Sequence, residues 1–370
     1  MGVTGKAIAS TYAADGTLTV EFVDKELPDP TGHEVLVQVG AAPINPSDLG
    51  VMFGPADLAH ADYAPGRIVT RFPDGTPPPF LKRIGYPLPC GNEGAGTVIA
   101  AGEAPEAQAL LGKTVTCLQG GMYSEYRLVD CRACMALPDG TDAATAASSF
   151  VNPITALSFV ETMRKEGFTG LIHTAAASNL GQILVKICRE DGVPLVNIVR
   201  SQAQADLLRG IGAEHVCDST APDFHAQLVA AIRATGAMLA YDAIGGGELA
   251  SRIFAAMEEV AATDTPFDPY GTHVRKKVYV YGMLDRGPTV IHRDFGFTWE
   301  LNGYILTDFL ARSAPEWMMA ARERVVAGLT TTFASRYTGQ VPLLRMLDRD
   351  VVAEYAKMRT GEKVLIVPNG

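Results

Sequence analysis

The chain has 370 residues, a formal net charge of -10, and a composition that is 47% hydrophobic and 19% charged. That length suggests two or three domains at roughly 150 residues each, and the composition suits a globular protein with a large core. The acidic balance argues against a nucleic-acid binder, which normally carries a basic face.

The first residues lack the apolar segment of a signal peptide. No apolar stretch approaches the roughly 18 residues of a membrane span. We therefore expect a cytoplasmic protein with neither a membrane nor a nucleic acid as partner.

Six cysteines are scattered along the chain. Without a secretory signal, a disulfide framework is not expected. Cys131 and Cys134 form a C-x-x-C pair, but a structural zinc needs four ligands and no second pair lies nearby. We interpret the pair as ordinary thiols near a strand end, and we expect no metal site.

The first third of the chain has the residue pattern of a β-rich domain. Apolar and polar residues alternate with the period of half-buried strands, and turn residues separate the runs. The predicted strands are Leu18–Val23, Glu34–Val39, Gly94–Ala100 and Thr114–Leu118.

Residues 55–89 differ from their surroundings because prolines are frequent there, including Pro77-Pro78-Pro79. Such a stretch is too rich in proline for a central strand or a helix. It is either a functional lid or binding loop or a plain surface insertion. Its basic residues are Arg67, Arg71, Lys82 and Arg83.

From about Asp142 strands alternate with helices, which predicts βαβ units and a parallel sheet. An alanine-rich helical stretch begins at Ala143. The later expected strands and helices are Leu171–Thr174, a helix over Gln182–Arg189, Leu195–Val199, a helix over Ser201–Gly210, Met238–Asp242 and Val278–Gly282, with a short strand Lys363–Val367 near the end.

The turn after Leu171–Thr174 has the small residues of a phosphate-binding joint. Unpaired N–H groups and the dipole of a helix start favour an anion, and small residues let the backbone approach it. The pattern here is A-x-x-S-x-x-G, which keeps only the last glycine of G-x-G-x-x-G, and a plain strand–helix joint is the alternative. The candidate cofactor-binding residues are Ala175, Ala176, Ser178, Asn179, Leu180 and Gly181.

Arg200 follows the next strand, about 20 residues beyond Gly181, where dinucleotide-binding folds place the residue that reads the ribose. An acid there would repel a 2′-phosphate, whereas Arg200, helped by Ser201, would bind it. This predicts NADPH as cofactor; an ordinary solvated arginine is the alternative. Gly245, Tyr281 and Gly282 follow later strands and are further candidates at the carboxyl edge of the sheet.

In these motifs the chain resembles the medium-chain dehydrogenase/reductase superfamily, and most closely its zinc-independent branch of quinone oxidoreductases and 2-enoyl thioester reductases. The motifs occur in family order across nearly the whole chain. They are Ile44-Asn45-Pro46-Ser47-Asp48, Pro89–Gly96, Val151-Asn152-Pro153-Ile154-Thr155-Ala156, Ala175–Gly181, Gly212–Val216 and Thr360–Leu365.

The resemblance implies a fold and an assembly. A GroES-like catalytic domain would cover residues 1–150, completed by residues 331–370. A Rossmann domain with a doubly wound parallel sheet, residues 151–330, would bind NADP. Family members commonly form homodimers that pair their Rossmann sheets edge to edge.

Zinc relatives place cysteine, histidine and cysteine where this chain has Asn45, Asn92 and Val151. None of these three is a good zinc ligand. Hydride addition to a polarised acceptor, such as a quinone or an activated C=C bond, then fits better than alcohol oxidation.

By the same resemblance, Asn45 and Thr155 lie beside the nicotinamide, with Ser47 and Asn152 close to them, and Lys363 in the last motif contacts the cofactor. Asn45 would orient the carboxamide or donate to the acceptor; a turn-forming asparagine before Pro46 is the alternative. Enoyl thioester reductases carry a tyrosine acid just after the Asn45–Asp48 run, which this chain lacks. Tyr63 is a possible substitute, as is Tyr123, although both residues could simply be packing.

The sequence therefore predicts a zinc-free, NADPH-dependent reductase of quinones or α,β-unsaturated carbonyl compounds that acts on a small molecule as a homodimer. One alternative is a 2-enoyl thioester reductase whose basic residues in 55–89 meet a phosphorylated carrier. Another is a non-catalytic member that keeps NADPH binding. An aromatic group could line an acceptor pocket, form a subunit interface or be buried core: Phe295, Phe297, Trp299 and Tyr304.

Overall fold

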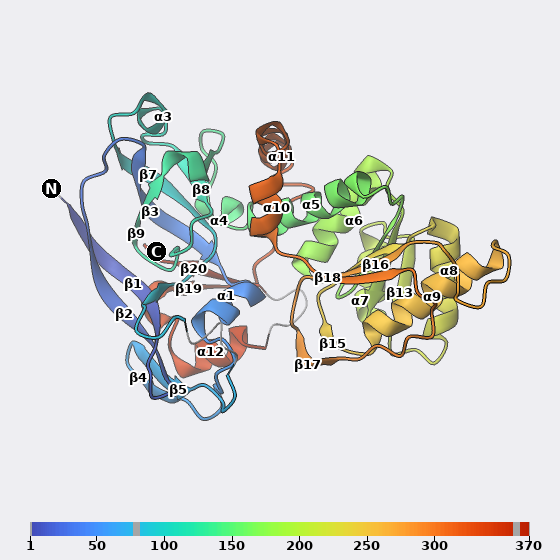
Figure 1. Ribbon diagram of the computed structural model, residues 1–370. Helices are drawn as coiled ribbons and strands as arrows, with labels where there is room; N and C mark the ends of the chain where they lie inside the picture. Colours follow the sequence, from blue (N-terminus) through green and yellow to red (C-terminus); the bar gives the residue numbers. More distant parts are fainter. Residues whose placement is uncertain (1, 77–81, 358–362, 370) are drawn as a thin grey trace. The chain divides into compact units, whose positions relative to one another are not determined.

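The computed structural model describes residues 2–76, 82–357 and 363–369. It forms two compact units, the first made of Met1–Val151 and Arg324–Gly370 and the second of Asn152–Glu323 (Figure 1). We call them the β-rich unit and the parallel-sheet unit. The predicted α/β class with these two kinds of fold is confirmed. The assignment of one unit to catalysis and the other to NADP binding stays a prediction.

Two sheets build the β-rich unit. One has the order β4-β5-β2-β1-β6, and the other β10-β8-β7-β3-β20-β19, with β9 also paired to β3. The strands are β1 (Val3–Tyr12), β2 (Thr17–Leu27), β3 (Glu34–Pro43), β4 (Asp62–Ala64), β5 (Arg67–Arg71), β6 (Leu88–Pro89), β7 (Gly94–Ala101), β8 (Thr114–Cys117), β9 (Tyr126–Asp130), β10 (Cys134–Ala136), β19 (Gly339–Pro342) and β20 (Val364–Val367).

Alternation along the strands creates the core of this unit. Ile8 on β1, Leu18 on β2 and Val37 on β3 are fully buried in one apolar cluster. The C-terminal strand β20 pairs with β3 through Ala42 and Pro43, so the end of the chain completes this unit. Its short helices are α1 (Pro46–Met52), α3 (Pro105–Gln108), η1 (Cys131–Ala133), α4 (Ala143–Ala146), η2 (Leu343–Arg345) and α12 (Arg349–Tyr355).

The interpretation of residues 55–89 as a lid or a plain insertion was wrong for residues 62–71. There β4 and β5 are part of the first sheet, and β5 pairs with β2. The run Arg67–Arg71 contains no proline, and its alternate residues Ile68 and Thr70 are buried, so it has the pattern of a strand. Pro77-Pro78-Pro79 lies outside the described residues, as does the segment Thr360-Gly361-Glu362 of the last family motif.

The parallel-sheet unit has one six-stranded sheet of order β13-β12-β11-β14-β16-β18, in which all pairings are parallel. The order reverses between β11 and β14, which is the position where such folds bind ligands. Gly245–Gly247 forms the short strand β15, which pairs with β17. The strands are β11 (Leu171–His173), β12 (Leu195–Val199), β13 (His215–Asp218), β14 (Leu239–Asp242), β16 (Lys276–Val280), β17 (Asp285–Thr289) and β18 (Trp299–Gly303).

Helices cover both faces of this sheet. All residues of β12 are buried, as expected of a strand covered on both faces. Helices α8 and α9 pack with Ile172, Val196 and Val278 in one apolar cluster. The helices in and after this unit are α5 (Val151–Lys165), α6 (Asn179–Asp191), α7 (Gln202–Gly210), α8 (Phe224–Thr235), α9 (Leu249–Thr263), α10 (Leu306–Arg312) and α11 (Pro315–Ala327).

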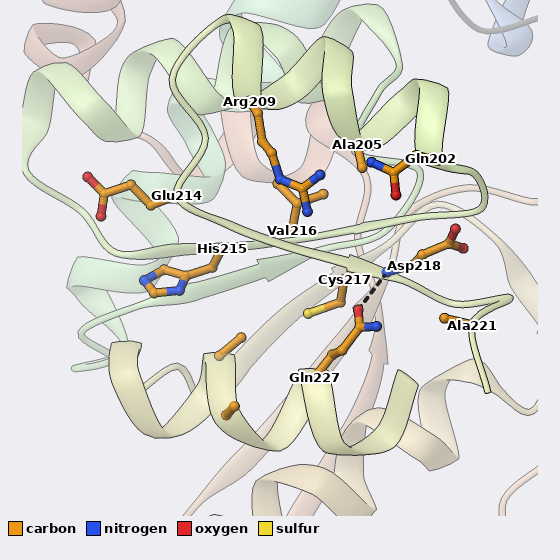
Figure 2. Close-up of a pocket in the computed structure, with 12 residues that line it drawn as sticks. Gln202, Ala205, Arg209, Glu214, His215, Val216, Cys217, Asp218, Ala221 and Gln227 are labelled. Atoms are coloured by element: carbon orange, nitrogen blue, oxygen red, sulfur yellow. Dashed lines mark hydrogen bonds between the residues drawn. The ribbon is translucent and has the colours of Figure 1, made fainter. Parts of the chain in front are cut away.

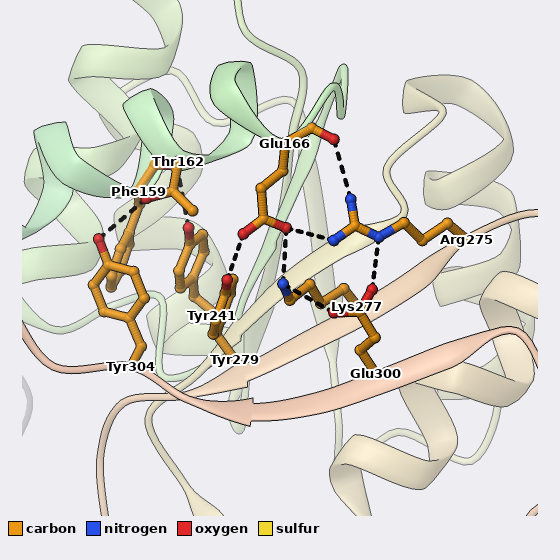
Figure 3. Close-up of polar contacts among 9 residues, drawn as sticks. All are labelled: Phe159, Thr162, Glu166, Tyr241, Arg275, Lys277, Tyr279, Glu300 and Tyr304. Atoms are coloured by element: carbon orange, nitrogen blue, oxygen red, sulfur yellow. Dashed lines mark hydrogen bonds and ion pairs between the residues drawn. The ribbon is translucent and has the colours of Figure 1, made fainter. Parts of the chain in front are cut away.

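The face under α5 is aromatic and charged. Phe159 of α5 stacks on Tyr241, with ring centroids 3.7 Å apart. Glu166, just after α5, accepts hydrogen bonds from Arg275 and Lys277, each at 2.8 Å, and from the Tyr279 hydroxyl (Figure 3). This ionic cluster holds the end of α5 against the sheet.

The predicted aromatic group divides between the two faces. Phe295 is buried and stacks with Phe254 on the face covered by α9, and Trp299 packs beside them. Tyr304 lies under α5, where its hydroxyl donates to Ser158 Oγ at 2.8 Å. Phe297 is 79% exposed. These residues therefore do not form a single pocket lining.

One segment reaches membrane-span length, contrary to expectation. Ala143–Lys165 is long and apolar enough to cross a membrane by length and composition alone. In the structure 72% of its most apolar window is buried within the protein, which is typical of a core helix.

All six cysteines are free and buried. Burial raises the pKa of the Cys90 thiol to about 12 and that of Cys217 to about 11. Cys131 and Cys134 lie at η1 and the start of β10, and Cys134 Sγ is 3.6 Å from Cys117 Sγ. The C-x-x-C pair therefore packs in the core of the β-rich unit as separate thiols.

Candidate active site

The turn after β11 has the geometry of an anion-binding helix start. Ser178 caps α6, since its Oγ accepts the N–H of Gly181 at 3.2 Å. Ala175 has a left-handed φ of 48°, which is costly for a residue with a side chain. A Cβ at Gly181 would lie 2.0 Å from the carbonyl oxygen of Ala176, so only glycine allows this approach of helix and turn. The predicted role of Gly181 in close packing is thus found in the structure.

The neighbouring strand ends are tied to this turn. Thr174 Oγ1 donates to Asp242 Oδ1 at 2.7 Å, and the same Asp242 accepts from the N–H groups of Ile244 and Gly245. Gly245 has a φ of +81°. Asp242 therefore fixes the loop after β14 against the end of β11, on either side of the point where the strand order reverses.

Tyr281 and His173 form a buried pair near the ends of β16 and β11. The Tyr281 hydroxyl lies 2.7 Å from His173 Nε2. Burial lowers the pKa of His173 to about 3, so its imidazole is neutral at ordinary pH. A Cβ at Gly282 would lie 2.5 Å from the carbonyl oxygen of Ala243, so the two loops approach closely here. Tyr281 and Gly282 are thus placed at the carboxyl edge, as expected.

Two predicted asparagines meet within the parallel-sheet unit. Asn152 Nδ2 donates to Asn179 Oδ1 at 2.8 Å, which links α5 to the first residue of α6. Thr155, one turn further along α5, is buried, and its carbonyl oxygen accepts from Ser158 Oγ at 2.7 Å.

Arg200 immediately follows β12, the strand that pairs with β11. Its N–H donates to Gln204 Oε1 at 3.1 Å. Its exposed side chain has no hydrogen bond or ion pair to any other described residue. Ser201 caps α7 through its Oγ. The guanidinium is therefore available to an anion at the carboxyl end of β12.

In the β-rich unit, two fully buried carboxylates surround Asn45. Asp48 Oδ2 accepts the N–H of Asn45 at 2.7 Å, and its Oδ1 accepts the N–H of Asn92 at 2.6 Å. Glu93 Oε1 accepts Asn45 Nδ2 at 2.9 Å. Asn92 Nδ2 donates to Ser47 Oγ at 3.0 Å. Asn45, Ser47 and Asn92 are thus brought together.

Lys363 is buried in the same unit, and its Nζ donates to Ser148 Oγ at 2.6 Å. Burial lowers the pKa of Lys363, whereas the charges of Glu93 and Asp48 raise it. Tyr337 also donates to Ser148, at 2.7 Å. These contacts give Lys363 a role inside the unit, and its role in cofactor binding stays a prediction.

The two candidate tyrosine acids differ in placement. Tyr123 is fully buried, with its hydroxyl donating to the carbonyl oxygen of Pro43 at 3.0 Å, so it packs in the core. Tyr63 is half-buried on β4, with the guanidinium of Arg349 5.5 Å from its ring centroid. Burial raises the pKa of Tyr63. Its catalytic role stays a prediction.

The residues at the zinc positions do not fit a zinc ion. The Asn45 and Asn92 amides are committed to Glu93 and Ser47, and Val151 has no ligand atom in its side chain. Such a set lacks the thiolate and imidazole ligands that zinc requires.

Two hollows open on the parallel-sheet unit. One of about 470 Å³ follows the edge strand β13, between α7 and α8, and is lined by Arg209, His215 and Asp218 among others (Figure 2). The other, about 390 Å³, lies beside Tyr279 and Tyr304. Neither includes the Ala175–Gly181 turn, so we base the candidate site on the turn and not on the hollows.

Three buried carboxylates that contact predicted residues in their own units were not singled out from the sequence: Asp48, Glu93 and Asp242. Asp48 and Glu93 stand inside the quoted family motifs, and Asp242 follows an apolar strand. The signal available in the sequence was an acidic residue directly beside apolar residues. Such a residue is expected to be buried, and a buried carboxylate needs hydrogen-bond donors. Asp48 and Glu93 accept the distant N–H groups of Asn92, Phe150 and Val151, whereas the N–H groups that Asp242 accepts lie two and three residues away.

Comparisons with known proteins agree with this architecture. Residues 31–139 match the alcohol dehydrogenase GroES-like domain. The chain is 28% identical over 226 residues to the human mitochondrial enoyl-[acyl-carrier-protein] reductase, covering 57% of this chain and 52% of that protein. It is 28% identical over 173 residues to a Leishmania amazonensis protein named as a quinone oxidoreductase, covering 45% and 48% of the two chains. The chain thus spans about half the length of these curated relatives.

Solved structures match along nearly the whole chain. A Mesorhizobium loti protein assigned as an NADPH:quinone reductase has a TM-score of 0.75 and 28% identity, covering 99% of this chain and 98% of its own. A mycobacterial protein solved with NADPH has a TM-score of 0.68 over 98% of this chain; at 20% identity it supports the fold alone. The GroES-like match and the likeness along the whole chain confirm the predicted resemblance to the medium-chain dehydrogenase/reductase superfamily.

Proposed function

We propose that this protein is an NADPH-dependent, zinc-free oxidoreductase that passes hydride to a quinone or to an activated C=C bond. The observation that carries the proposal is Arg200. It follows the strand beside the Ser178–Gly181 helix start, with an exposed guanidinium and no other described residue as partner.

The two features suit two parts of one dinucleotide. The N–H groups at the start of α6, capped by Ser178, suit the pyrophosphate. Arg200, with the Ser201 hydroxyl beside it in sequence, suits a 2′-phosphate, because a guanidinium binds phosphate oxygens in a bidentate manner. An acidic residue after β12 would favour NADH instead.

Bound NADPH would supply the hydride. The protein must then stabilise the negative charge that develops on the carbonyl oxygen of the acceptor, which requires hydrogen-bond donors. We assign this chemistry to the predicted set Asn45, Ser47, Asn152 and Thr155, with Tyr63 as the candidate proton donor. Their amide and hydroxyl groups can orient and donate without a metal ion.

The 2-enoyl thioester reductase remains the second candidate, because several similar curated proteins are enoyl-[acyl-carrier-protein] reductases. Three of the four basic residues proposed to meet a phosphorylated carrier instead have partners within the β-rich unit. Arg67 pairs with Glu21 at 3.3 Å, and Arg71 donates to the carbonyl oxygen of Asp15. Arg83 donates to carbonyl oxygens of the unit itself, at Val51 and Ser10.

The test measures the oxidation of NADPH and of NADH through the change in absorbance. The protein is first freed of metal ions with a chelator, and three acceptors are compared: a benzoquinone, an enone and a crotonyl thioester. Turnover with NADPH on the quinone or enone is expected. Turnover on the thioester alone would favour the second candidate. Tight NADPH binding without turnover on any acceptor would support the non-catalytic alternative.

A further inference from the structure

Two cysteines of the β-rich unit lie opposite each other on neighbouring strands. Cys117 ends β8, Cys134 begins β10, and the two residues are direct partners in the antiparallel pairing of these strands. Their sulfur atoms are 3.6 Å apart. The next pair along the strands, Met135 with Thr116, keeps the same register. The fold thus brings two thiols into contact that are 17 positions apart in the sequence.

This placement matches what a disulfide bond requires. Directly opposed residues of an antiparallel pair have Cα atoms about 4.5–5.5 Å apart, and bridged cysteines have Cα atoms about 4.4–6.8 Å apart. Bond formation would shorten the sulfur–sulfur distance from 3.6 Å to about 2.05 Å. Rotation of the two short side chains can supply this change, so the strands can keep their pairing.

The thiol that meets Cys134 is not the one that the C-x-x-C spacing suggests. Among the described residues, the neighbour of Cys131 Sγ at hydrogen-bond distance is His33 Nδ1, at 3.9 Å. Cys131 belongs to the turn η1, whereas Cys134 belongs to β10. The pairing of the strands therefore favours Cys117 over Cys131 as the partner of Cys134.

The two thiols differ in exposure and in hydrogen bonding. Cys117 is completely buried, whereas Cys134 is 7% exposed. Cys134 Sγ donates to the carbonyl oxygen of Asp130 at 3.8 Å, which leaves its sulfur to accept the S–H of Cys117. This hydrogen bond and burial raise the pKa of Cys117 well above its usual range. An oxidant from solution therefore reaches Cys134 before Cys117.

We propose that Cys117 and Cys134 form an oxidisable dithiol, which hydrogen peroxide converts to an intramolecular disulfide. In the first step the Cys134 thiol reacts with the peroxide to give a sulfenic acid and one water molecule. The Cys117 sulfur then bonds to the Cys134 sulfur, and the sulfenic hydroxyl group leaves with the Cys117 proton as a second water molecule. The two thiols are oxidised by two electrons, which reduce the peroxide, and a thiol reductant reverses the bond.

Peptide mapping of the full-length protein tests the pairing. The folded protein is treated with hydrogen peroxide, the excess is removed with catalase, and the chain is unfolded with iodoacetamide present to block the remaining thiols. Digestion without reductant and mass spectrometry should find one crosslinked pair, Cys117 with Cys134, that disappears on reduction. The chain oxidised while unfolded in urea is the positive control, and it should give several of the pairings that six cysteines allow.

Alanine variants test the order of the two steps. In Cys117→Ala the sulfenic acid has no thiol to meet, so dimedone, which reacts with sulfenic acids, should label Cys134. In Cys134→Ala the completely buried Cys117 should stay unlabelled. Two matched controls should keep the crosslink: Cys131→Ala, which removes the other thiol of the C-x-x-C pair, and Cys90→Ala, which removes a completely buried thiol of the same unit.

Each failure overturns a stated part of the proposal. Folded wild-type protein without the Cys117–Cys134 crosslink, under conditions that crosslink the unfolded chain, overturns the dithiol itself. A crosslink between Cys131 and Cys134 in its place overturns the pairing across the strands. Dimedone on Cys117 in Cys134→Ala, with none on Cys134 in Cys117→Ala, overturns the order of the steps. The mapping of the wild-type protein decides the pairing even where a variant does not fold.

Discussion

Arg200 is the single side chain on which cofactor choice depends in the proposed function. We predict that Arg200→Ala weakens NADPH binding about tenfold or more, because a charge-assisted hydrogen bond to phosphate contributes roughly 1.5–3 kcal/mol. NADH binding should hardly change. Titration of both dinucleotides checks this, with Arg209→Ala, an exposed arginine at the other end of α7, as the matched control. Equal losses for both dinucleotides would remove Arg200 as the 2′-phosphate reader.

Asp48 makes stability depend on pH. Burial raises the pKa of Asp48 from 3.8 to about 7, against the lowering effect of the N–H groups of Asn45 and Asn92. Between about pH 4 and 7 the folded protein therefore holds a proton that the unfolded chain releases, and stability from this group falls as pH rises.

The variant Asp48→Asn has no proton to release there. We predict that the free energy of unfolding of wild type minus that of the variant decreases from about pH 4 to 7 and is flat above. Urea denaturation at a series of pH values measures it. A difference that increases over this window would show that the hydrogen bonds outweigh burial.

At the scale of elements, the start of α6 requires a residue without a side chain at Gly181. We predict that Gly181→Ala destabilises the protein by about 1–3 kcal/mol, as overpacking does, since the new Cβ would meet the carbonyl oxygen of Ala176. Gly210→Ala, at the end of α7, meets no atom within 4 Å and should be neutral or stabilise by up to about 1 kcal/mol. Chemical denaturation of the two variants is the comparison; similar losses would refute the close-packing argument.

Arg83 ties the segment before β6 to β1 and α1. We predict that Arg83→Met lowers the free energy of unfolding by about 1–3 kcal/mol, because the Ser10 and Val51 carbonyl oxygens lose their donors. It should leave the KM for crotonyl-CoA relative to a simple enone unchanged. Lys82→Met is the neighbouring control for the stability measurement. A selective rise in the thioester KM would revive the carrier-binding role.

At the scale of the whole molecule, the homodimer expected from the family resemblance remains to be measured. β18 is the terminal strand of its sheet, and two apolar side chains near it are exposed, Phe297 at 79% and Ile305 at 58%. We predict that light scattering gives the mass of two chains for the wild-type protein. The double variant with Phe297→Ser and Ile305→Ser should give the mass of one chain. Phe267→Ser, at an exposed position beyond α9, is the control. A monomeric wild type would refute the prediction.

The sequence was a good guide where local pattern decides structure. The apolar run Leu195–Val199 could be predicted because a strand covered on both faces needs little else. Arg67–Arg71 was missed because nearby prolines masked a short alternating run. Glu93 could not be assigned, because its partners, the N–H groups of Phe150 and Val151 and the amide of Asn45, come near it only in the folded chain.

The buried thiols have a consequence for the chemistry proposed here. Quinones and enones alkylate cysteine through the thiolate. This chain keeps all six thiols buried, and burial raises the pKa of several, including Cys90 and Cys217. Under the proposed function, this burial would slow the alkylation of these thiols by the enzyme's own acceptor.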